Sequence, residues 1–155
     1  MIKTIKTLMD KIDDKTLVIT STGMISRVVF SVKDRPQTFY IMGSMGASLG
    51  IGIGLALNTE RQVVVISGDG DILMSLGSLV LMNNLKLKNL KLYILDNNEY
   101  SSTGGQKTCS RDVNFKSLAK NVKVFKIPKG KPDVGRIKLT PEQIKERFYN
   151  EINGM

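Results

Sequence analysis

Hydrophobic residues along this chain alternate between short runs of strand length and longer stretches with helical spacing. Apolar side chains recur every three or four residues over residues 1–12, which predicts an amphipathic helix. Short apolar runs follow at residues 16–20, 38–42, 63–66 and 90–95, and we predict a strand at each. Helical patterns stand between these runs, so the chain predicts an α/β fold with a largely parallel sheet.

The same patterns predict further elements. Helices are expected at residues 26–30, 47–58, 72–85 and 115–120, and another strand at residues 121–128. A last helix begins at Thr140-Pro141-Glu142-Gln143, with Thr at the N-cap, Pro at the first helical position and Gln at the third. The helix over residues 72–85 does not separate into an apolar and a polar face, so we expect it to be well covered.

Three glycines, Gly46, Gly50 and Gly54, recur every four residues and would form one small-residue face on the helix over residues 47–58. Close packing against the sheet or against another helix explains this spacing. The glycines do not form the fingerprint GxGxxG in the context that a dinucleotide site requires, so a NAD site is not predicted.

Composition narrows the classes of function. The 155 residues fit one domain, 1–155, and a single cysteine, Cys109, excludes an internal disulfide and a cysteine-built zinc site. The chain has no histidine, which excludes histidine acid-base chemistry from this chain. No apolar run reaches the length of a membrane span, and no signal-peptide core precedes the first helix, so we expect a cytoplasmic protein with no membrane partner.

The net charge of +9 raises nucleic-acid binding as an alternative function. Basic residues recur along the chain, but no basic stripe is interleaved with aromatic residues. We therefore interpret the lysines as a solvated surface and expect no nucleic-acid partner.

Two polar turns follow neighbouring predicted strands. Ser67-Gly68-Asp69-Gly70 comes directly after residues 63–66, and Asp96-Asn97-Asn98 comes directly after residues 90–95. The carboxyl ends of parallel strands lie on one edge of a sheet, where open α/β folds bind ligands.

The chemistry of the two turns is complementary. Asp69 offers a carboxylate and Asn97 an amide oxygen, and such hard oxygen ligands suit Mg²⁺ together with phosphate oxygens and water. Gly68 and Gly70 allow the backbone to approach a ligand, and the unpaired amides that open the following helix can bind a phosphate. The pair of turns predicts a magnesium-diphosphate site. Two ordinary turns rich in Gly and Asn are the alternative.

Gly68-Asp69-Gly70, followed after 26 residues by Asn97-Asn98, resembles the signature of thiamine diphosphate enzymes. The resemblance implies the thiamine diphosphate-binding fold, a largely parallel sheet flanked by helices on both faces, with thiamine diphosphate and Mg²⁺ as cofactors. In that family the Asp, the Asn and a backbone carbonyl two residues after the Asn hold the metal. The implied ligands here are Asp69, Asn97 and the carbonyl of Glu99; the alternative register uses Asn98 and the carbonyl of Tyr100.

A second turn, Gly43-Ser44-Met45-Gly46, is similar to the family's turn that touches the aminopyrimidine ring. The resemblance implies that Met45 wedges under the cofactor and bends it, while the Gly43 carbonyl accepts a hydrogen bond from the 4′-amino group. Met45 as an ordinary core residue is the alternative.

The closest resemblance is to the small decarboxylases that act on sulfopyruvate and phosphonopyruvate. Those proteins carry a turn similar to Ser21-Thr22-Gly23-Met24 and a Tyr-x-Ser-Thr-Gly-x-Gln-x-Thr run, which Tyr100 to Thr108 matches here. The resemblance implies an anionic 2-oxoacid substrate. The implied cofactor-binding residues are Thr22, Gly23, Gly43, Ser44, Met45, Gly68, Gly70, Asp71, Tyr100, Ser102 and Thr103.

Three features depart from the family pattern. Asp71 stands where a Ser is usual, and a carboxylate beside a diphosphate repels it unless a cation intervenes. The segment near Lys120 looks short, so a crossover could be lost. Nothing at the N-terminus resembles the second domain, whose glutamate activates the pyrimidine ring.

The third departure implies a separate pyrimidine-domain subunit in a hetero-oligomer, with no catalytic residue on this chain and with self-association of the chain in isolation. Three alternatives remain: a subunit of an acetolactate-synthase-like enzyme, a subunit of a transketolase-like enzyme, or a non-catalytic subunit that retains the fold.

Overall fold

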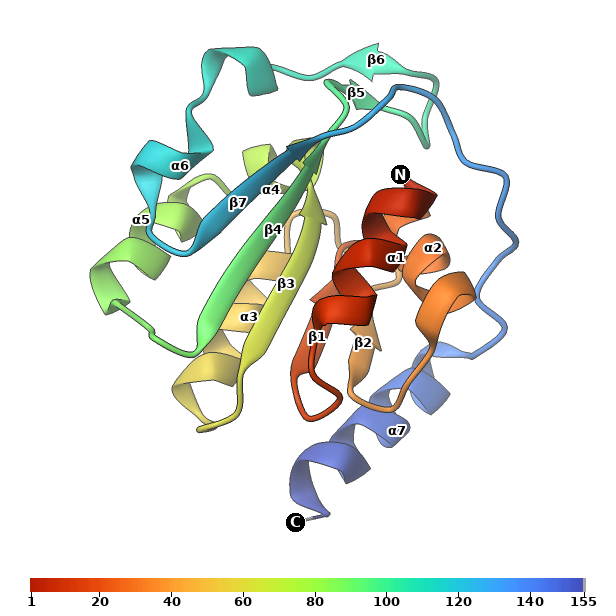
Figure 1. The fold of residues 1–155 in the computed structure, drawn as a ribbon, viewed down its shortest axis with the longest axis vertical. Coiled ribbons are helices and arrows are strands. Elements are labelled where there is room, and N and C mark those ends of the chain that lie inside the picture. The colour runs from red at the N-terminus through yellow and green to blue at the C-terminus, as the bar shows by residue number, and fades with distance from the viewer. Residues whose placement is uncertain (155) are drawn as a thin grey trace.

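The computed structural model of the chain describes residues 1–154, and a five-stranded parallel sheet forms its centre (Figure 1). The strands, in spatial order, are β2 (Thr38–Tyr40), β1 (Leu17–Thr20), β3 (Val63–Gly68), β4 (Leu90–Asp96) and β7 (Val122–Lys126). All neighbouring strands pair in parallel, as predicted. The chain passes from β1 to β2 on one side and then returns to β3 on the other. The gap between the ends of β1 and β3 is therefore a topological switch point, where such sheets bind ligands.

Helices cover both faces of this sheet, as the family resemblance implied. The helices are α1 (Ile2–Lys11), α2 (Met24–Lys33), α3 (Ser48–Leu57), α4 (Asp69–Met74), α5 (Gly77–Leu85), α6 (Phe115–Leu118) and α7 (Pro141–Asn153). One core packs α1 and α2 against the sheet, and the other packs α3, α4, α5 and α6 against the opposite face. Alternation of side chains along the strands supplies both cores, because Val64 and Ile66 face one layer while Val63 and Val65 face the other.

The C-terminal helix α7 packs beside the edge strand β2. Its N-terminus is the predicted capping box, in which Thr140 and Gln143 each bind the other's backbone amide. Arg147 donates hydrogen bonds of 2.9 and 2.7 Å to the two carboxylate oxygens of Asp34, and its guanidinium lies over the ring of Tyr40. These contacts hold the helix against the sheet.

Several predicted elements differ from the structure in extent. α2 is longer than residues 26–30, β2 ends at Tyr40 rather than at residue 42, and β3 continues to Gly68. After the short helix α6, β7 pairs in parallel with β4, so one parallel crossover is present here. The shortening expected near Lys120 stays a prediction. The polar loop that follows Tyr100 is closed by a small hairpin, in which β5 (Glu99–Tyr100) pairs with β6 (Gln106–Lys107), and the 3₁₀ turn η1 (Ser110–Asp112) comes next.

The single helix predicted over residues 72–85 is in fact two. α4 ends at Met74, and Ser75 leaves the helical conformation with φ −129° before α5 begins at Gly77. Ser and Gly have low helix propensity, which accounts for a break at this point. The expectation that the segment is well covered is wrong, because Met74, Val80 and Leu81 are exposed.

The small-residue face of α3 is also not packed within this chain. Gly50 and Gly54 are exposed, and a Cβ at either would meet nothing within 4 Å. Gly52, on the opposite side of the helix, makes the close approach to the sheet, because a Cβ there would lie 2.3 Å from Val65. The Gly50 and Gly54 face remains open to another molecule.

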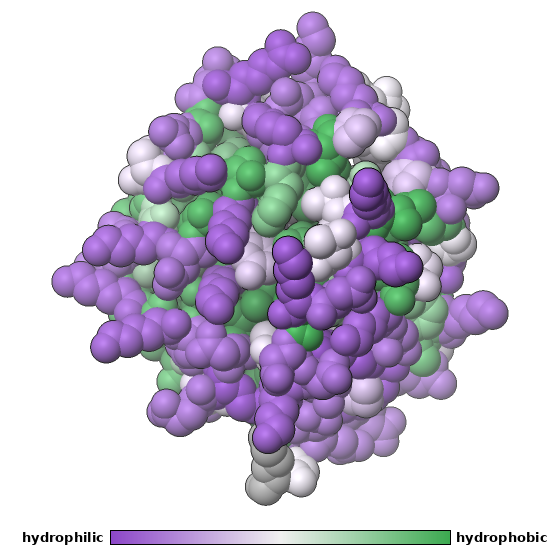
Figure 2. Space-filling model, in the orientation of Figure 1, coloured by the Kyte–Doolittle hydropathy of each residue, from purple (hydrophilic) through white to green (hydrophobic). Residues whose placement is uncertain are grey.

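The face of the molecule in Figure 2 is mostly hydrophilic, with hydrophobic areas separated by polar side chains, which agrees with the high lysine content. Among residues 1–154 no helix is long and apolar enough to cross a membrane.

Candidate functional site

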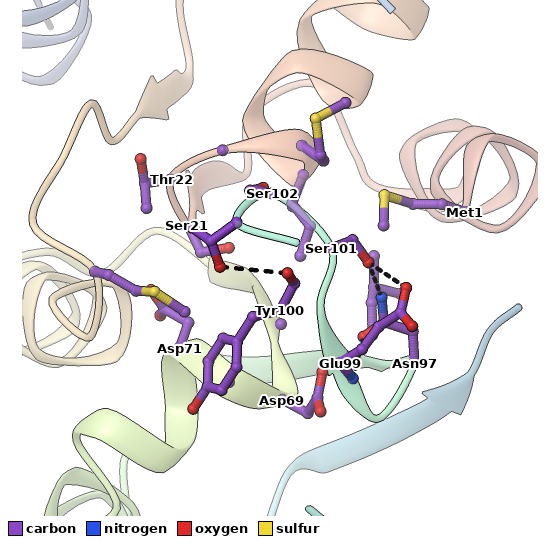
Figure 3. Close-up of a pocket in the computed structure, with 18 residues that line it drawn as sticks. Met1, Ser21, Thr22, Asp69, Asp71, Asn97, Glu99, Tyr100, Ser101 and Ser102 are labelled. Atoms are coloured by element: carbon purple, nitrogen blue, oxygen red, sulfur yellow. Dashed lines mark hydrogen bonds between the residues drawn. The ribbon is translucent and has the colours of Figure 1, made fainter. Parts of the chain in front are cut away.

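A cavity of about 250 Å³ lies at the carboxyl ends of β1, β3 and β4, at the switch point of the sheet (Figure 3). Most of the predicted site residues line it: Thr22, Gly23, Met45, Gly68, Asp69, Gly70, Asp71, Asn97, Glu99, Tyr100, Ser102 and Thr103. Gly43 and Ser44 belong to the turn that carries Met45, but they do not line the cavity. The fold thus brings together turns that lie almost eighty residues apart in the sequence.

The carboxylate of Asp69 sits at the end of β3 and is only 2 % exposed. Its Oδ2 atom accepts a hydrogen bond of 2.5 Å from the hydroxyl of Thr108. Burial raises the pKa of Asp69, the neighbouring carboxylate of Asp96 raises it further, and the bond from Thr108 opposes both. Among residues 1–154 no lysine or arginine forms an ion pair with Asp69. A buried carboxylate in these surroundings is stabilised by a bound cation.

The turn after β4 directs its two asparagines differently. Asn98 adopts φ +57°, and its amide group donates to Asp96 and to Ser110. Asn97 lines the cavity instead, and its amide group donates to Ser101 at 2.6 Å (Figure 3). This geometry supports the register in which Asn97, rather than Asn98, is the metal ligand.

The carboxylate of Glu99 is occupied by contacts with other residues of the chain and is therefore not free to take part in catalysis. Its Oε1 atom accepts hydrogen bonds from the Gly130 amide at 2.6 Å and from the Ser101 hydroxyl at 2.8 Å, and Lys129 lies 4.0 Å from the other oxygen. The Gly130 and Ser101 bonds and the charge of Lys129 lower the pKa of Glu99. Its carboxylate therefore anchors the segment after β7, while its backbone stays at the turn where a metal-binding carbonyl is expected.

The donor set at these strand ends fits a magnesium ion. Within residues 1–154 no group of three or more His, Cys, Asp or Glu side chains could hold a metal. The predicted site has one carboxylate, Asp69, together with the amide oxygen of Asn97 and the carbonyl of Glu99. Mg²⁺ usually takes one or two carboxylates and completes its octahedron with phosphate oxygens and water, so three ligands from the chain are sufficient.

The turn over residues 43–46 reaches the cavity from the end of β2. Gly43, Ser44 and Gly46 all have positive φ, and the Gly43 amide donates to the hydroxyl of Thr22 at 3.1 Å. Met45 projects from this turn, is 41 % exposed and lines the cavity. Met45 is therefore not an ordinary core residue, and its position suits contact with a bound molecule.

The loop after Tyr100 closes the cavity from the other side. The ring of Tyr100 packs so closely over Gly70 that a Cβ there would lie 2.3 Å from the ring. The hydroxyl of Ser102 lies less close to Gly23, at 3.1 Å from a Cβ position. Space therefore requires glycine at position 70, whereas φ +82° favours it at position 23. Ser101 donates its hydroxyl to Glu99, and the Thr103 hydroxyl has longer contacts to Tyr100 and Gln106, at 3.4 and 3.2 Å. The Ser102 hydroxyl has no such acceptor among residues 1–154, so it is the best placed of the three to donate to a phosphate oxygen.

Asp71 lines the cavity, but hydrogen-bond donors of the chain occupy both of its carboxylate oxygens. Oδ1 accepts from the Gly46 amide at 2.8 Å, and Oδ2 accepts from the hydroxyls of Ser48 at 2.5 Å and Ser67 at 2.8 Å. The repulsion expected between this carboxylate and a diphosphate is reduced by these three donors.

Some residues of the cavity were not predicted as site residues: Met1, Ser21, Met24, Ile25, Leu95 and Ser101. Ser21 and Met24 belong to the turn over residues 21–24, and Ser101 belongs to the run over residues 100–108. Other residues of both motifs were predicted as site residues, so these three could have been included. No local pattern indicates Met1, because it reaches the cavity through the packing of α1. The lining contains no lysine or arginine among residues 1–154, so the basic character of the chain is not concentrated here.

Comparison with known proteins agrees with this geometry. Residues 19–142 match the family model described as thiamine pyrophosphate enzyme, C-terminal TPP binding domain. The sulfopyruvate decarboxylase subunit beta of Methanocaldococcus jannaschii is 40 % identical over 152 residues, covering 96 % of this chain and 75 % of that protein. The phosphonopyruvate decarboxylase of Streptomyces viridochromogenes is 40 % identical over 118 residues, covering 76 % of this chain and 30 % of that protein.

A solved structure shares the fold. A protein from Mycobacterium smegmatis described as a thiamin diphosphate-dependent enzyme superposes with a TM-score of 0.63 at 21 % identity, covering 76 % of this chain and 24 % of that one. The family model covers most of the chain, including both strand-end turns. The chain therefore belongs to the thiamine pyrophosphate enzymes, as a TPP-binding domain of the C-terminal type.

Proposed function

We propose that this chain is the diphosphate-binding subunit of a thiamine diphosphate-dependent decarboxylase that acts on an anionic 2-oxoacid, of the sulfopyruvate or phosphonopyruvate type. The observation that carries the proposal is the placement of Asp69 and Asn97, on neighbouring strand ends, in one cavity with the turn that carries Met45. Similarity over almost the whole chain to a protein named sulfopyruvate decarboxylase subunit beta supports the choice of reaction. A cytoplasmic location, expected from the sequence, belongs to the same proposal.

Different residues of this chain would contact the metal, the diphosphate and the rings of the cofactor. Asp69, Asn97 and the carbonyl of Glu99 would hold Mg²⁺, which holds the diphosphate. The hydroxyls of Ser102 and Thr103 would donate to phosphate oxygens, and Met45 would support the bent cofactor. Bound thiamine diphosphate supplies the nucleophilic carbon and the electron sink that decarboxylation of a 2-oxoacid requires.

A partner subunit would supply the glutamate that activates the pyrimidine ring. Glu99 is the one glutamate of the cavity lining among residues 1–154, and its carboxylate is bound to Gly130 and Ser101. The open side of α3, with Gly50, Gly54 and the exposed side chain of Leu57, offers an apolar surface on which such a partner could pack.

The partner would also contribute to recognition of the anionic substrate. The cavity lining has no lysine or arginine among residues 1–154, whereas a sulfonate or phosphonate is bound best by charged donors. We therefore place the cation that recognises the second anionic group of the substrate on the partner, or on basic residues outside the lining.

The test is reconstitution of the complex. The purified chain, saturated with Mg²⁺ and thiamine diphosphate, should release no carbon dioxide from sulfopyruvate or phosphonopyruvate until a second, pyrimidine-domain subunit is added. Pyruvate in the same assay is the matched substrate, because it lacks the second anionic group and should be decarboxylated much more slowly. Turnover by the chain alone at the rate of the mixture would refute the need for a partner. Carbon–carbon bond formation between two 2-oxoacids would identify an acetolactate-synthase-like enzyme instead.

A further inference from the structure

The 43–46 turn has one local backbone hydrogen bond, from the Ala47 amide to the Ser44 carbonyl at 3.1 Å, and is otherwise held by groups from other segments. Gly43, Ser44 and Gly46 all lie in the left-handed region, which is costly for a serine. Residues 43–45 are exposed, so close packing fixes the turn only at Gly46. The Gly43 amide is bound by Thr22 at one end, and the Gly46 amide is bound by the Asp71 carboxylate at the other.

Asp71 is well suited to hold its end of the turn. The side chain is only 3 % exposed, and it accepts from the Gly46 amide with one oxygen and from Ser48 and Ser67 with the other. Ser48 begins α3 and Ser67 lies in β3, so one carboxylate joins the turn, the following helix and the strand that carries Asp69.

The contact is also sterically tight. Gly46 has φ +94°, and a Cβ there would lie 3.0 Å from the Cβ of Met74, at the end of α4. The turn therefore rests directly against the helix that Asp69 and Asp71 open. Any movement of the Asp71 carboxylate is passed to the backbone one residue from Met45.

We propose that Asp71 is a positioning residue, which fixes Met45 relative to the metal ligand Asp69 through the Gly46 amide, and is not a ligand of the diphosphate. The effect on turnover rests on the proposed function, whereas the effect on the turn itself does not. A carboxylate with three internal donors acts here through hydrogen bonds, so a neutral side chain of the same shape should replace it. In Asn, the carbonyl oxygen can accept from Gly46 while the amide group donates to the two serine hydroxyls.

The first test measures the turn without cofactor. Hydrogen exchange of the Gly46 amide, followed by NMR in the isolated chain, should be about tenfold or more faster in Asp71→Ala than in the wild-type chain. Asp71→Asn should keep the wild-type rate. Asp10→Ala is the matched control, since Asp10 is exposed on α1 and forms no ion pair or side-chain hydrogen bond among residues 1–154. Where Asp71→Ala does not fold, Asp71→Ser replaces it, because the shorter side chain cannot span Gly46 and both serines.

The second test measures cofactor and turnover in the complex with the partner subunit. Asp71→Ala should lower kcat by about 10- to 100-fold, because misplacing a positioning group by about 1 Å costs up to that factor, while the Kd of Mg²⁺-thiamine diphosphate changes less than about threefold. Asp71→Asn should restore kcat.

The outcomes separate the two proposals. No turnover by the wild-type complex, together with normal exchange results, would refute the proposed function alone. Wild-type exchange at Gly46 in Asp71→Ala would overturn the positioning role, as would equal losses of kcat in Asp71→Ala and Asp71→Asn. Tighter cofactor binding in Asp71→Asn would also overturn it, since that result shows the carboxylate repelling a diphosphate in direct contact.

Discussion

Replacing Gly70 with alanine tests the close contact between the start of α4 and the ring of Tyr100. Gly70 is the second residue of α4, and its φ is not in the left-handed region, so alanine adds no backbone strain. The added Cβ would lie 2.3 Å from Cε1 of the Tyr100 ring and 2.8 Å from Cδ1. The substitution therefore acts through the ring and the loop that follows it.

The size of the displacement follows from the contact distances. Carbon atoms of neighbouring side chains rest at about 3.5 Å, so the ring must move by about 1.2 Å to accept the methyl group. Tyr100 is joined to the cavity residues Ser101 and Ser102, so their hydroxyls shift with it. A displacement of about 1 Å in a positioning group can cost about 100-fold in rate, and we expect a loss of that order in kcat/KM together with weaker cofactor binding.

Fold stability should change much less than activity. Alanine is favoured over glycine in a helix by about 1 kcal/mol, which offsets part of the overpacking cost of about 1–3 kcal/mol. Gly77→Ala is the matched control, because Gly77 begins α5 and a Cβ there meets nothing within 4 Å. Calorimetric titration with Mg²⁺ and thiamine diphosphate, thermal unfolding and carbon dioxide release by the complex give the three measurements.

A second substitution, at Tyr100, tests whether the clash with its ring causes the loss in Gly70→Ala. If the ring is the obstacle, Tyr100→Ala in the Gly70→Ala background should restore part of the cofactor affinity lost by Gly70→Ala alone. Gly70→Ala with wild-type affinity and turnover, and a melting temperature raised like that of Gly77→Ala, would refute the reasoning.

Three further predictions concern other parts of the chain. Asp69→Ala should abolish metal-dependent cofactor binding measured by calorimetry while the fold survives; unchanged affinity would refute the metal assignment. Met45→Ala should lower kcat more than it changes the cofactor Kd, and because Met45 is 41 % exposed the melting temperature should hardly change. Burial raises the pKa of Asp34, but the bonds from Arg147 and Tyr40 outweigh it and leave the pKa lower than that of an ordinary aspartate. The stabilisation by this carboxylate is therefore fully present above the pKa of the unfolded chain and is lost as the pH falls through the lowered pKa of the folded chain. Because solvent screens this partly exposed ion pair, Asp34→Ala should destabilise the chain by only about 1 kcal/mol at pH 7. The variant should also lose less stability than the wild-type chain as the pH falls, measured by denaturant titration at several pH values; the same loss of stability in both chains would contradict this account.

The parallel sheet and its ligand edge could be predicted from the hydrophobic pattern, whereas the order of the strands was not predicted. Runs of strand length separated by helical patterns indicated a parallel sheet, and its observed pairings are all parallel. The residues at which helices and strands begin and end were harder to predict from the sequence. The break between α4 and α5 depends on Ser75 and Gly77, whose low helix propensity is easily overridden in other contexts.

Exposure was harder to predict than secondary structure. Gly50 and Gly54 have the spacing of a packed helix face, yet both are open, and the buried approach to the sheet is made by Gly52. The spacing is the same whether the covering surface lies in this chain or in another. A sequence pattern reports that a face is small or apolar and does not report which molecule covers it.

The position of the turn after β4 could be predicted from the sequence, and only the family resemblance favoured Asn97 over Asn98 as a metal ligand there. Asn97 and Asn98 are chemically identical and adjacent, so composition cannot separate them. The left-handed backbone at Asn98 turns its side chain toward Asp96 and Ser110, and leaves Asn97 at the cavity. Asparagine tolerates this conformation at either position, and tertiary hydrogen bonds decide which of the two adopts it.

Two carboxylates that lie two residues apart have different roles because their donors differ. Asp69 accepts a hydrogen bond from the hydroxyl of Thr108 and lies near a second carboxylate, Asp96, so its negative charge is incompletely compensated. Asp71 accepts hydrogen bonds from the Gly46 amide and from the hydroxyls of Ser67 and Ser48. Ser48 lies at the start of α3, 23 residues earlier in the chain. A divalent cation gains most beside the group whose charge has the fewest internal donors, so Mg²⁺ is expected at Asp69. The same comparison explains how the fold accommodates a buried aspartate at position 71, where the family resemblance leads us to expect serine. One backbone amide and two serine hydroxyls donate to its carboxylate.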